Sequence, residues 1–398
     1  MKILIATDWI PPNYVGGAER TIKELEDYLS AQNCSVFYLS IKQKIDQSRK
    51  TRNNVHSFPA LRMRRRANSH YILKLIDKII GLIDPVSPIL MALKARSLKC
   101  DLILVHQVSR FGIFFSLVLR FVVPKKVTIV RVFHDLSETC IKRTRFRKYQ
   151  ICRKTCLPCR PLTFVGRVSS NYYDFKIFNS KFTLNKYAEL GYSVEKSFVG
   201  HPYILNEDTI TELNIDNHAS TLIADSADIV RIGFVGRVCA EKGVKSLVQA
   251  LGKADTPYEL HTVGYATPKF QNELNNIASQ LNLKLTSHGY KEQPFRYISE
   301  FIDLVVVSSE LEEAFGRVVI EAASFGLPIL VANVGGLPEA TKLIKPEPML
   351  YDPENFSFPR EQVNAARVQP ETIVLKHADS MAYPMKTILK LIERRKNS

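Results

Sequence analysis

Short apolar runs alternate with segments of helical periodicity along the first half of the chain. The helical spacing is clearest at Ala18, Ile22, Leu25 and Leu29, which recur every three or four residues. Short apolar runs predict buried strands at residues 2–7, 35–40, 102–106, 127–133 and 175–179. Strands and helices that alternate in this way are typical of parallel β-α-β units.

The same pattern restarts after a polar segment at about residues 203–228, which carries no clear strand signal. Apolar runs then predict strands at residues 229–235, 260–263, 304–307 and 328–332, with a helix at residues 244–251. We therefore predict an α/β protein with two doubly wound, Rossmann-like parallel-sheet domains, at residues 1–205 and 206–378. The basic amphipathic segment at residues 379–398 is predicted to form a terminal helix that packs back toward the first domain. Ligands of open α/β sheets bind beyond the carboxyl ends of the strands, so we expect a ligand cleft between the domains.

Composition narrows the protein class. Of 398 residues, 45% are hydrophobic and 24% are charged, which is typical of globular proteins and excludes wholesale disorder. Seven cysteines are too few for a disulfide scaffold of this length. The most apolar stretch, residues 102–130, is interrupted by four basic residues and cannot span a bilayer. We therefore expect a cytoplasmic protein.

The net charge of +16 is unevenly distributed. Lys and Arg greatly exceed Asp and Glu before residue 200, whereas acidic residues slightly outnumber them afterwards. Arg62, Arg64, Arg65 and Arg66 precede a stretch at residues 71–95 that resembles an amphipathic helix. This combination predicts peripheral binding to an anionic membrane surface, at the inner face of the cell membrane. No nucleic-acid-binding module accompanies the arginines, so we expect no nucleic-acid partner. The alternative to membrane binding is that the positive charge keeps a soluble enzyme dispersed.

The segment at residues 308–339 carries the strongest chemical signal. Glu313 follows a predicted buried strand, and Glu321 lies eight residues later in a predicted helix that starts near Gly316. A helix N-terminus flanked by two carboxylates suits a diphosphate joined to two polyols, because carboxylates accept hydrogen bonds from vicinal hydroxyls. The alternative, a solvent-facing acidic helix, does not explain an acid flanked by Ile320 and Ala322.

A second loop follows the strand that opens the second half. Arg237 and Lys242 lie beyond the strand's carboxyl end, where they could neutralise a diphosphate. The spacing matches neither a dinucleotide fingerprint nor a P-loop. Two basic residues in a loop are otherwise most often simply solvated.

Together these segments resemble the retaining GT-B glycosyltransferases of glycosyltransferase family four, the glycosyl transferases group 1. The resemblance lies in the E-x7-E spacing with Ala314, Phe315 and Gly316 after the first Glu, in G-R-x4-K-G at residues 236–243 and in Gly-Gly-Leu-Pro-Glu at residues 335–339. It implies a GT-B fold, with Glu321 on the ribose, Glu313 on the sugar hydroxyls, and Arg237 and Lys242 on the diphosphate of a UDP- or GDP-sugar. No metal or other cofactor would be required, because the two basic residues carry the needed charge.

Two features of the first half also resemble this family. Gly16 and Gly17 resemble its N-terminal glycine loop, which faces the donor, and His134 resembles the histidine placed near the transferred sugar. Each has a plainer interpretation, an ordinary β-α turn and a structural histidine. His106, which also ends a predicted strand, is a weaker candidate.

A cysteine cluster follows His134. Cys140, Cys152, Cys156 and Cys159 could hold a structural zinc, and the last three also match the spacing of radical iron–sulfur enzymes, in an unsuitable context. Unliganded thiols remain the default interpretation.

The sequence thus predicts a retaining, hexosyltransferase-type glycosyltransferase. The expected substrates are a nucleotide sugar and a glycan acceptor, lipid-linked or part of a cell-surface polysaccharide. A catalytically silent nucleotide-sugar-binding subunit and a sugar-nucleotide epimerase of the same fold remain as alternatives.

Overall fold

The computed structural model describes residues 1–10, 16–41, 54–58, 86–107, 111–142, 144–147, 150–203, 210–214, 229–354, 357–358 and 360–397. The arginine cluster at residues 62–66, the first part of the helix predicted at residues 71–95 and the domain boundary predicted at residue 205 lie outside these ranges. The chain forms two compact units. Unit 1 contains Met1–Arg143, Lys154–Asp208 and His377–Ser398, and unit 2 contains Thr144–Arg153 and Thr209–Lys376.

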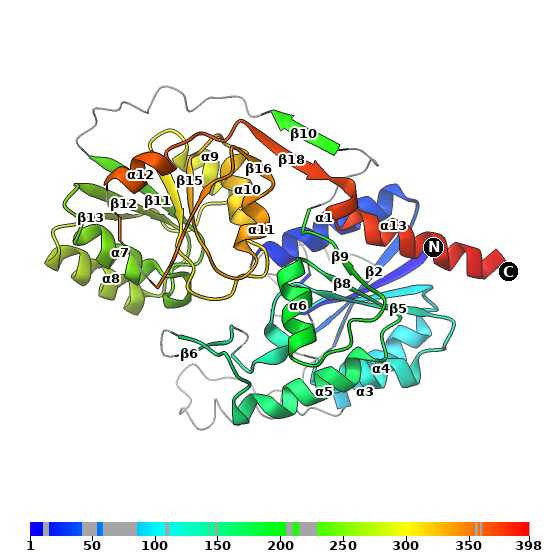
Figure 1. Ribbon diagram of the computed structural model, residues 1–398. Helices are drawn as coiled ribbons and strands as arrows, with labels where there is room; N and C mark the ends of the chain where they lie inside the picture. The colour runs from blue at the N-terminus through cyan, green and yellow to red at the C-terminus, as the bar shows by residue number, and fades with distance from the viewer. Residues whose placement is uncertain are drawn as a thin grey trace. The chain divides into compact units, whose positions relative to one another are not determined.

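A seven-stranded sheet forms the centre of unit 1 (Figure 1). All its neighbouring strands are parallel, in the order β3-β2-β1-β4-β5-β8-β9. The strands are β1 (Lys2–Ala6), β2 (Ser35–Ile41), β3 (Val55–Phe58), β4 (Leu102–Val105), β5 (Thr128–Phe133), β8 (Phe175–Phe178) and β9 (Ser197–Val199).

Helices cover both faces of this sheet, as the continuous apolar character of its strands requires. Ile3 and Ile5 pack toward α1 (Gly17–Ala31) and α13 (Ala382–Asn397). Leu4 and Ala6, which point to the opposite face, pack toward α3 (Val86–Ser97) and α4 (Phe115–Val122). The terminal helix α13 therefore contributes directly to the core of unit 1.

The remaining elements of unit 1 follow β5 and β8. They are the short turns η1 (Ser137–Thr139) and η2 (Leu157–Cys159) and the helices α5 (Arg160–Ser170) and α6 (Lys181–Glu189). A capping box starts α6, because the Ser180 side chain accepts from the Thr183 amide while the Thr183 hydroxyl accepts from the Ser180 amide. Between η1 and η2, β6 (Phe146–Arg147) and β7 (Gln150–Ile151) form a small hairpin that belongs to unit 2.

Unit 2 contains a six-stranded parallel sheet in the order β13-β12-β11-β14-β15-β17. Its strands are β11 (Val230–Val235), β12 (Tyr258–Val263), β13 (Lys284–Ser287), β14 (Leu304–Val307), β15 (Ile329–Ala332) and β17 (Met349–Tyr351). Its helical elements are η3 (Ala240–Lys242), α7 (Val244–Gly252), α8 (Pro268–Gln280), α9 (Pro294–Ile298), α10 (Arg317–Ala323), α11 (Leu337–Thr341) and α12 (Arg360–Ala366). The chain then returns to unit 1 at η4 (His377–Asp379), which leads into α13.

A small antiparallel sheet corrects one expectation. β10 (Ile210–Asn214) pairs with β18 (Thr372–Lys376), which also pairs with β16 (Ile344–Lys345). The polar segment at residues 203–228 was predicted to lack a strand, so β10 contradicts that prediction. An edge strand is held by backbone hydrogen bonds to one neighbour and needs no continuous apolar run.

The predicted fold class is confirmed: the chain is an α/β protein with two parallel-sheet units. The strands predicted at residues 102–106, 127–133, 229–235 and 304–307 appear as β4, β5, β11 and β14 with shifts of at most one residue at either end. The expected cleft between the two domains stays a prediction. No helix in the described part of the chain combines the length and the apolar character that crossing a bilayer would require.

Candidate functional site

In unit 2, two loops that follow strands bring Lys242 and Glu313 together. Lys242 ends η3, after β11, and Glu313 lies in the loop after β14, its neighbour in the sheet. The Lys242 ammonium donates to Glu313 Oε1 in an ion pair, and both side chains are largely buried. Ser309 Oγ donates to the same carboxylate oxygen at 2.5 Å. Residues 71 positions apart in the chain thus form one charged cluster.

The backbones of the two loops approach too closely for most side chains. Gly243 has a φ of 67°, and a Cβ atom there would lie 1.8 Å from the carbonyl oxygen of Ser308. The hydroxyl of Ser308 in turn donates to the carbonyl of Lys242 at 2.8 Å. Glycine at position 243 therefore allows the contact that places the lysine beside the glutamate.

A second glycine contact supports Glu313 from the other side. Gly335 has a φ of 62°, and a Cβ atom there would lie 2.5 Å from the carbonyl oxygen of Glu313. The amide of Gly336 donates to that same carbonyl at 2.7 Å. The Gly-Gly segment before α11 is therefore a backbone support for the Glu313 loop.

Glu313 stays ionised although it is buried. Burial alone would raise its pKa, but the charge of Lys242, the hydrogen bonds from Lys242 and Ser309 and the charge of Arg237 outweigh that effect and hold the pKa below its usual value. The pair is therefore a preformed carboxylate–ammonium unit.

Arg237 lies near this pair but remains exposed to solvent. It follows Gly236, whose carbonyl oxygen would lie 1.7 Å from a Cβ atom on Gly264, the residue after β12. The loop is thus packed against the neighbouring strand end, while the guanidinium projects from it. A phosphate group could reach Arg237 without displacing a buried partner.

Glu321 takes a different position. It lies in α10, where its carboxylate pairs with Arg317 one turn earlier, at 3.4 Å from Nε, and it is partly exposed. Phe315 is buried beneath the start of the helix, and Ala314 and Gly316 flank it. α10 has only seven residues, so we base the positive potential on Arg237 and Lys242 rather than on the helix N-terminus that the sequence suggested.

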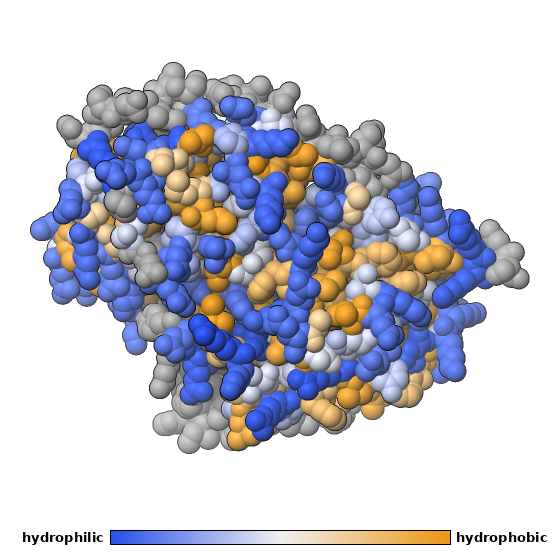
Figure 2. Space-filling view, in the orientation of Figure 1, coloured by the Kyte–Doolittle hydropathy of each residue, from blue (hydrophilic) through white to orange (hydrophobic). Residues whose placement is uncertain are grey.

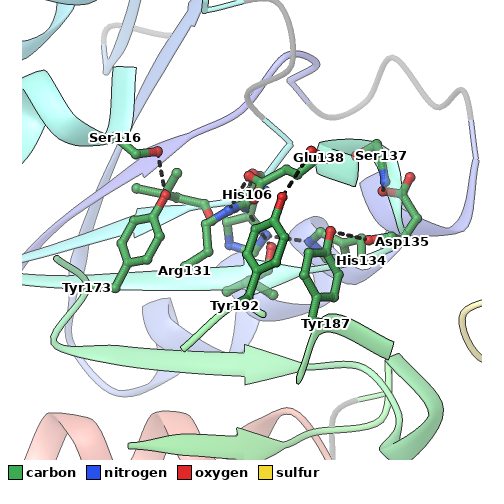
Figure 3. Close-up of polar contacts among 12 residues, drawn as sticks. His106, Ser116, Arg131, His134, Asp135, Ser137, Glu138, Tyr173, Tyr187 and Tyr192 are labelled. Carbon is green, nitrogen blue, oxygen red and sulfur yellow. Dashed lines mark hydrogen bonds and ion pairs between the residues drawn. The ribbon is translucent and has the colours of Figure 1, made fainter. Parts of the chain in front are cut away.

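In unit 1, His106 and His134 form a buried pair (Figure 3). His106 follows β4 and His134 follows the adjacent β5, so both lie at the carboxyl edge of the sheet. His106 Nδ1 and His134 Nε2 are 2.7 Å apart, and the rings stack with their centroids 5.0 Å apart. Asn179, which follows β8, donates to the backbone carbonyl of His134 at 2.7 Å.

A buried arginine lies next to the histidines. Arg131, in β5, donates to the carbonyls of Val105 and His106 and pairs with Glu138, with 2.8 Å between its Nε and Glu138 Oε1. Burial and the charge of Arg131 lower the pKa of His134 to about 3. Burial also lowers the pKa of His106 well below its usual value. Both rings are therefore neutral at physiological pH.

The hydrogen-bond partners of the ring nitrogens indicate which nitrogen of each histidine carries the proton. His106 Nε2 is buried and has no hydrogen-bond partner among the described residues. A buried ring N–H without an acceptor costs more than a bare acceptor, so the proton of His106 belongs on Nδ1. His106 then donates to His134 Nε2, and His134 carries its own proton on Nδ1. His134 is thereby fixed as a neutral hydrogen-bond donor.

The predicted glycine loop forms the start of α1. Gly16 is its N-cap and Gly17 its first residue. The carboxylate of Glu19 accepts hydrogen bonds from the Gly16 amide and its own amide, a common arrangement at helix starts. Burial, with smaller contributions from Asp135 and Asp8, nevertheless raises the pKa of Glu19.

The cysteine cluster is only partly assembled. The Sγ atoms of Cys156 and Cys159 lie 3.3 Å apart. Burial, together with the neighbouring Cys156 and Cys140, raises the pKa of Cys159 to about 12. Within the described ranges, no three His, Cys, Asp or Glu side chains are placed to hold a metal ion. The zinc site suggested by Cys140, Cys152, Cys156 and Cys159 is therefore not supported by the arrangement of these side chains.

Sequence reasoning singled out several of these residues but not their partners. It identified Lys242, Glu313 and His134, and it ranked His106 low. Arg131 and Ser309 were missed, although a charged residue inside the apolar run of β5 was a usable signal. Ser309 offered no signal, because serines are ordinary in loops.

Comparison with known proteins adds a domain match and a similarity of fold. Residues 224–353 match the family model described as Glycosyl transferases group 1, so the chain carries such a domain there. The lipopolysaccharide 1,2-N-acetylglucosaminetransferase of Salmonella typhimurium is 28% identical over 139 residues, 32% of this chain and 34% of that protein. The chain thus spans between about a quarter and two fifths of the length of the curated relatives it matches.

Solved structures cover nearly the whole chain at low sequence identity. The lipopolysaccharide outer core galactosyltransferase WaaB, in its apo form, superposes with a TM-score of 0.55 at 16% identity, over 89% of this chain and 87% of that chain. Anabaena Alr3699/HepE in complex with UDP superposes with a TM-score of 0.61 at 17% identity, over 92% and 89%. These similarities confirm the GT-B class of fold.

Proposed function

We propose that this protein is a retaining glycosyltransferase that transfers a hexose from a nucleotide sugar to a glycan acceptor. The observation that carries the proposal is the largely buried Lys242–Glu313 pair beside the exposed Arg237. These residues lie inside the region that matches the group 1 family, so chemistry and family similarity point to the same loops.

The pair suits a diphosphate leaving group. Lys242 and Arg237 supply two positive charges where negative charge develops as the bond between sugar and phosphate breaks, and preorganised electrostatics of this kind is usually the largest catalytic contribution. Glu313 holds Lys242 in place, and its oxygens can accept hydrogen bonds from the sugar hydroxyls. Glu321 is assigned to the ribose hydroxyls, which its partly exposed carboxylate can bind.

Retention follows from attack on the same face of the sugar. The acceptor oxygen bonds to the anomeric carbon as the bond to the diphosphate oxygen breaks, and the acceptor proton passes to the departing phosphate. Glu313 is engaged by Lys242 and Ser309, which argues against its use as a covalent nucleophile. His134, a neutral donor, is assigned a hydrogen bond to a sugar hydroxyl.

The substrates are proposed from similarity and charge. A solved structure of similar fold is described as a complex with UDP, which supports a UDP-sugar, while a GDP-sugar remains the second choice. The similar Salmonella protein is named for transfer onto lipopolysaccharide, which supports a lipid-linked or cell-surface glycan as acceptor here.

The test is turnover of a panel of UDP- and GDP-sugars by the purified full-length protein, measured as release of nucleoside diphosphate with and without lipid-linked glycan extracts. We expect slow release with one donor, stimulation by one extract, and retention of the donor's anomeric configuration by NMR of the product. Release should persist in EDTA, because Arg237 and Lys242 carry the positive charge. Binding without release would favour a silent nucleotide-sugar-binding subunit, and release with an isomerised sugar but no transfer would favour an epimerase.

A further inference from the structure

The helices on one face of the unit 1 sheet carry an apolar stripe that points outward. Val86, Ile89, Leu90 and Leu93 of α3 are 46–50% exposed and recur at helical spacing, so they lie on one side of the helix. Met91 and Ala95, on the opposite side, are buried against the sheet. A helix that is apolar on both sides is normally covered on both.

Aromatic side chains extend this stripe over the neighbouring helices. α4 packs against both α3 and α5. Phe121 of α4 is 74% exposed and contacts the ring of Tyr172, which follows α5, with 5.6 Å between the centroids. Phe164 of α5 is 66% exposed. We call the outward side of α3, α4 and α5 the α3–α5 face.

The three helices of the α3–α5 face contain basic but no acidic residues. Arg96, Arg160 and Arg167 are exposed, whereas Arg120 is largely buried and pairs with Asp174, which follows α5. Lys125 and Lys126, both exposed, lie in the loop after α4, four and five residues beyond Phe121. Orange and blue side chains mix along the lower border of Figure 2, where Figure 1 places α5 and α3.

The helix α1, on the other face of the same sheet, has a different composition. It contains Glu24 and Asp27 as well as Arg20 and Lys23, and Lys23 pairs with Asp27. Mixed charges of this kind are typical of a solvated helix surface. The absence of acids from the α3–α5 face is therefore a local feature rather than a consequence of the overall composition.

We propose that the α3–α5 face binds the surface of an anionic lipid bilayer. Phenylalanine, leucine and isoleucine side chains would enter the headgroup–acyl boundary, while lysines and arginines would bind lipid phosphates. A protein partner would usually present charges of both signs, whereas an anionic bilayer selects for a face without acids. The proposal concerns a surface remote in sequence from the donor loops and does not depend on the donor chemistry.

The test is flotation of the full-length protein with phosphatidylcholine vesicles and with vesicles of equal parts phosphatidylcholine and phosphatidylglycerol. We expect binding to the mixed vesicles, weakened by high salt because the attraction is screened. The double substitution Leu93→Gln and Phe121→Gln should reduce partitioning by roughly tenfold or more, because both side chains are exposed and their apolar area no longer enters the bilayer. Lys125→Gln with Lys126→Gln should reduce it by roughly tenfold and lower the salt dependence.

Matched control variants distinguish binding through the α3–α5 face from non-specific apolar or electrostatic binding by other parts of the protein. Ile229→Gln with Val368→Gln removes exposed apolar side chains from unit 2, and Lys390→Gln with Arg394→Gln removes two charges from α13, on the other face of the unit 1 sheet. Both pairs should bind the mixed vesicles like the original protein. Unchanged thermal unfolding and donor hydrolysis would show that the face variants are folded.

Three results would overturn the proposal. The first is equal binding to both kinds of vesicle, and the second is binding by the face variants that equals that of the original protein. The third is a dimer, detected by light scattering, that the Leu93→Gln/Phe121→Gln protein no longer forms. Such a dimer would mean that a second copy of the chain covers the face. Vesicle binding that depends on the face in a protein that hydrolyses no donor would leave this proposal standing and remove the proposed transferase.

Discussion

Each unit has a largely buried pair of polar side chains beyond the carboxyl ends of its strands. The pair in unit 2 is charged, whereas the pair in unit 1 is neutral. In unit 2, Glu313 stays ionised, because Lys242 provides the counter-charge that the carboxylate needs. In unit 1, His106 and His134 lie beside the buried cation Arg131, and both lose their charge. Both pairs are shielded from water, so the sign of the neighbouring charge decides whether a group stays ionised or becomes neutral.

The difference indicates what each pair can do. An ion pair stores a positive charge that an incoming diphosphate can share, which suits stabilisation of a leaving group. A neutral pair with fixed tautomers can orient a hydroxyl but cannot neutralise a phosphate. In the proposed function, unit 2 therefore stabilises the leaving-group charge and unit 1 orients a hydroxyl.

Removing the cation of the ionised pair should have the largest effect. We expect Lys242→Ala to lower kcat for nucleoside diphosphate release by about 10²–10³-fold, the cost typical of losing one preorganised group that stabilises transition-state charge. KM should change less, because the charge on the diphosphate is greatest in the transition state. Lys253→Ala, an exposed lysine just after the far end of α7, is the matched control and should be neutral. Equal rates in the two variants would remove Lys242 from the mechanism.

Disturbing the neutral pair should have a smaller effect. We expect His106→Leu to reduce kcat by roughly tenfold, since His134 loses the hydrogen bond that fixes its tautomer and the bond's net worth is about 1 kcal/mol or slightly more. His106→Asn should recover most of the rate, because its amide N–H can occupy the place of Nδ1–H. The readout is kcat against KM for both variants, with thermal unfolding as a check on folding. An asparagine variant as slow as the leucine variant would show that His106 acts through packing alone.

The neutral pair should also make stability depend on pH. His134 has a pKa of about 3 in the folded protein and about 6.5 when unfolded, so the unfolded chain binds more protons between these values. The free energy of unfolding should therefore fall as pH decreases from about 6.5, by up to about 1.4 kcal/mol per pH unit for each such histidine. His134→Asn should show a shallower decrease between pH 6.5 and pH 5 in urea unfolding, while Lys253→Ala should follow the original protein. Parallel curves for His134→Asn and the original protein would contradict the buried neutral state.

Site residues could be predicted from the sequence where a chemically distinctive side chain directly follows a recognisable strand pattern. The apolar run of β14 and the acid after it placed Glu313 in the loop that follows the strand, and the structure agrees. The contact of Glu313 with Lys242 could be inferred only through the family resemblance, because 71 residues separate them and no local spacing encodes the contact. The depth of burial of His106, and hence its lack of charge, was likewise inaccessible to spacing.

Periodicity also could not tell which side of a helix is covered. Residues 71–95 were predicted to be amphipathic, yet α3, in the described part of that range, is apolar on both sides. β10 was missed because backbone pairing to β18, rather than apolar burial, defines it. In both cases the deciding information lies in the neighbouring element and not in the segment itself.

The smallest expected effect concerns the hydroxyl that supports the ionised pair. Ser309 Oγ donates to Glu313 Oε1, so Ser309→Ala should raise the pKa of Glu313 toward its usual value while leaving the Lys242 pair in place. Loss of one hydrogen bond to a charged group is worth about 1.5–3 kcal/mol when nothing replaces it, but Lys242 still compensates the carboxylate, so we expect only a severalfold drop in kcat. Because a carboxylate with a raised pKa is protonated sooner on acidification, the acidic limb of the pH–rate profile should shift to higher pH. Ser246→Ala removes the hydroxyl that donates to Glu310 in the same loop and is the matched control, with an unshifted limb. A limb that stays in place in Ser309→Ala would mean that Lys242 alone keeps Glu313 ionised.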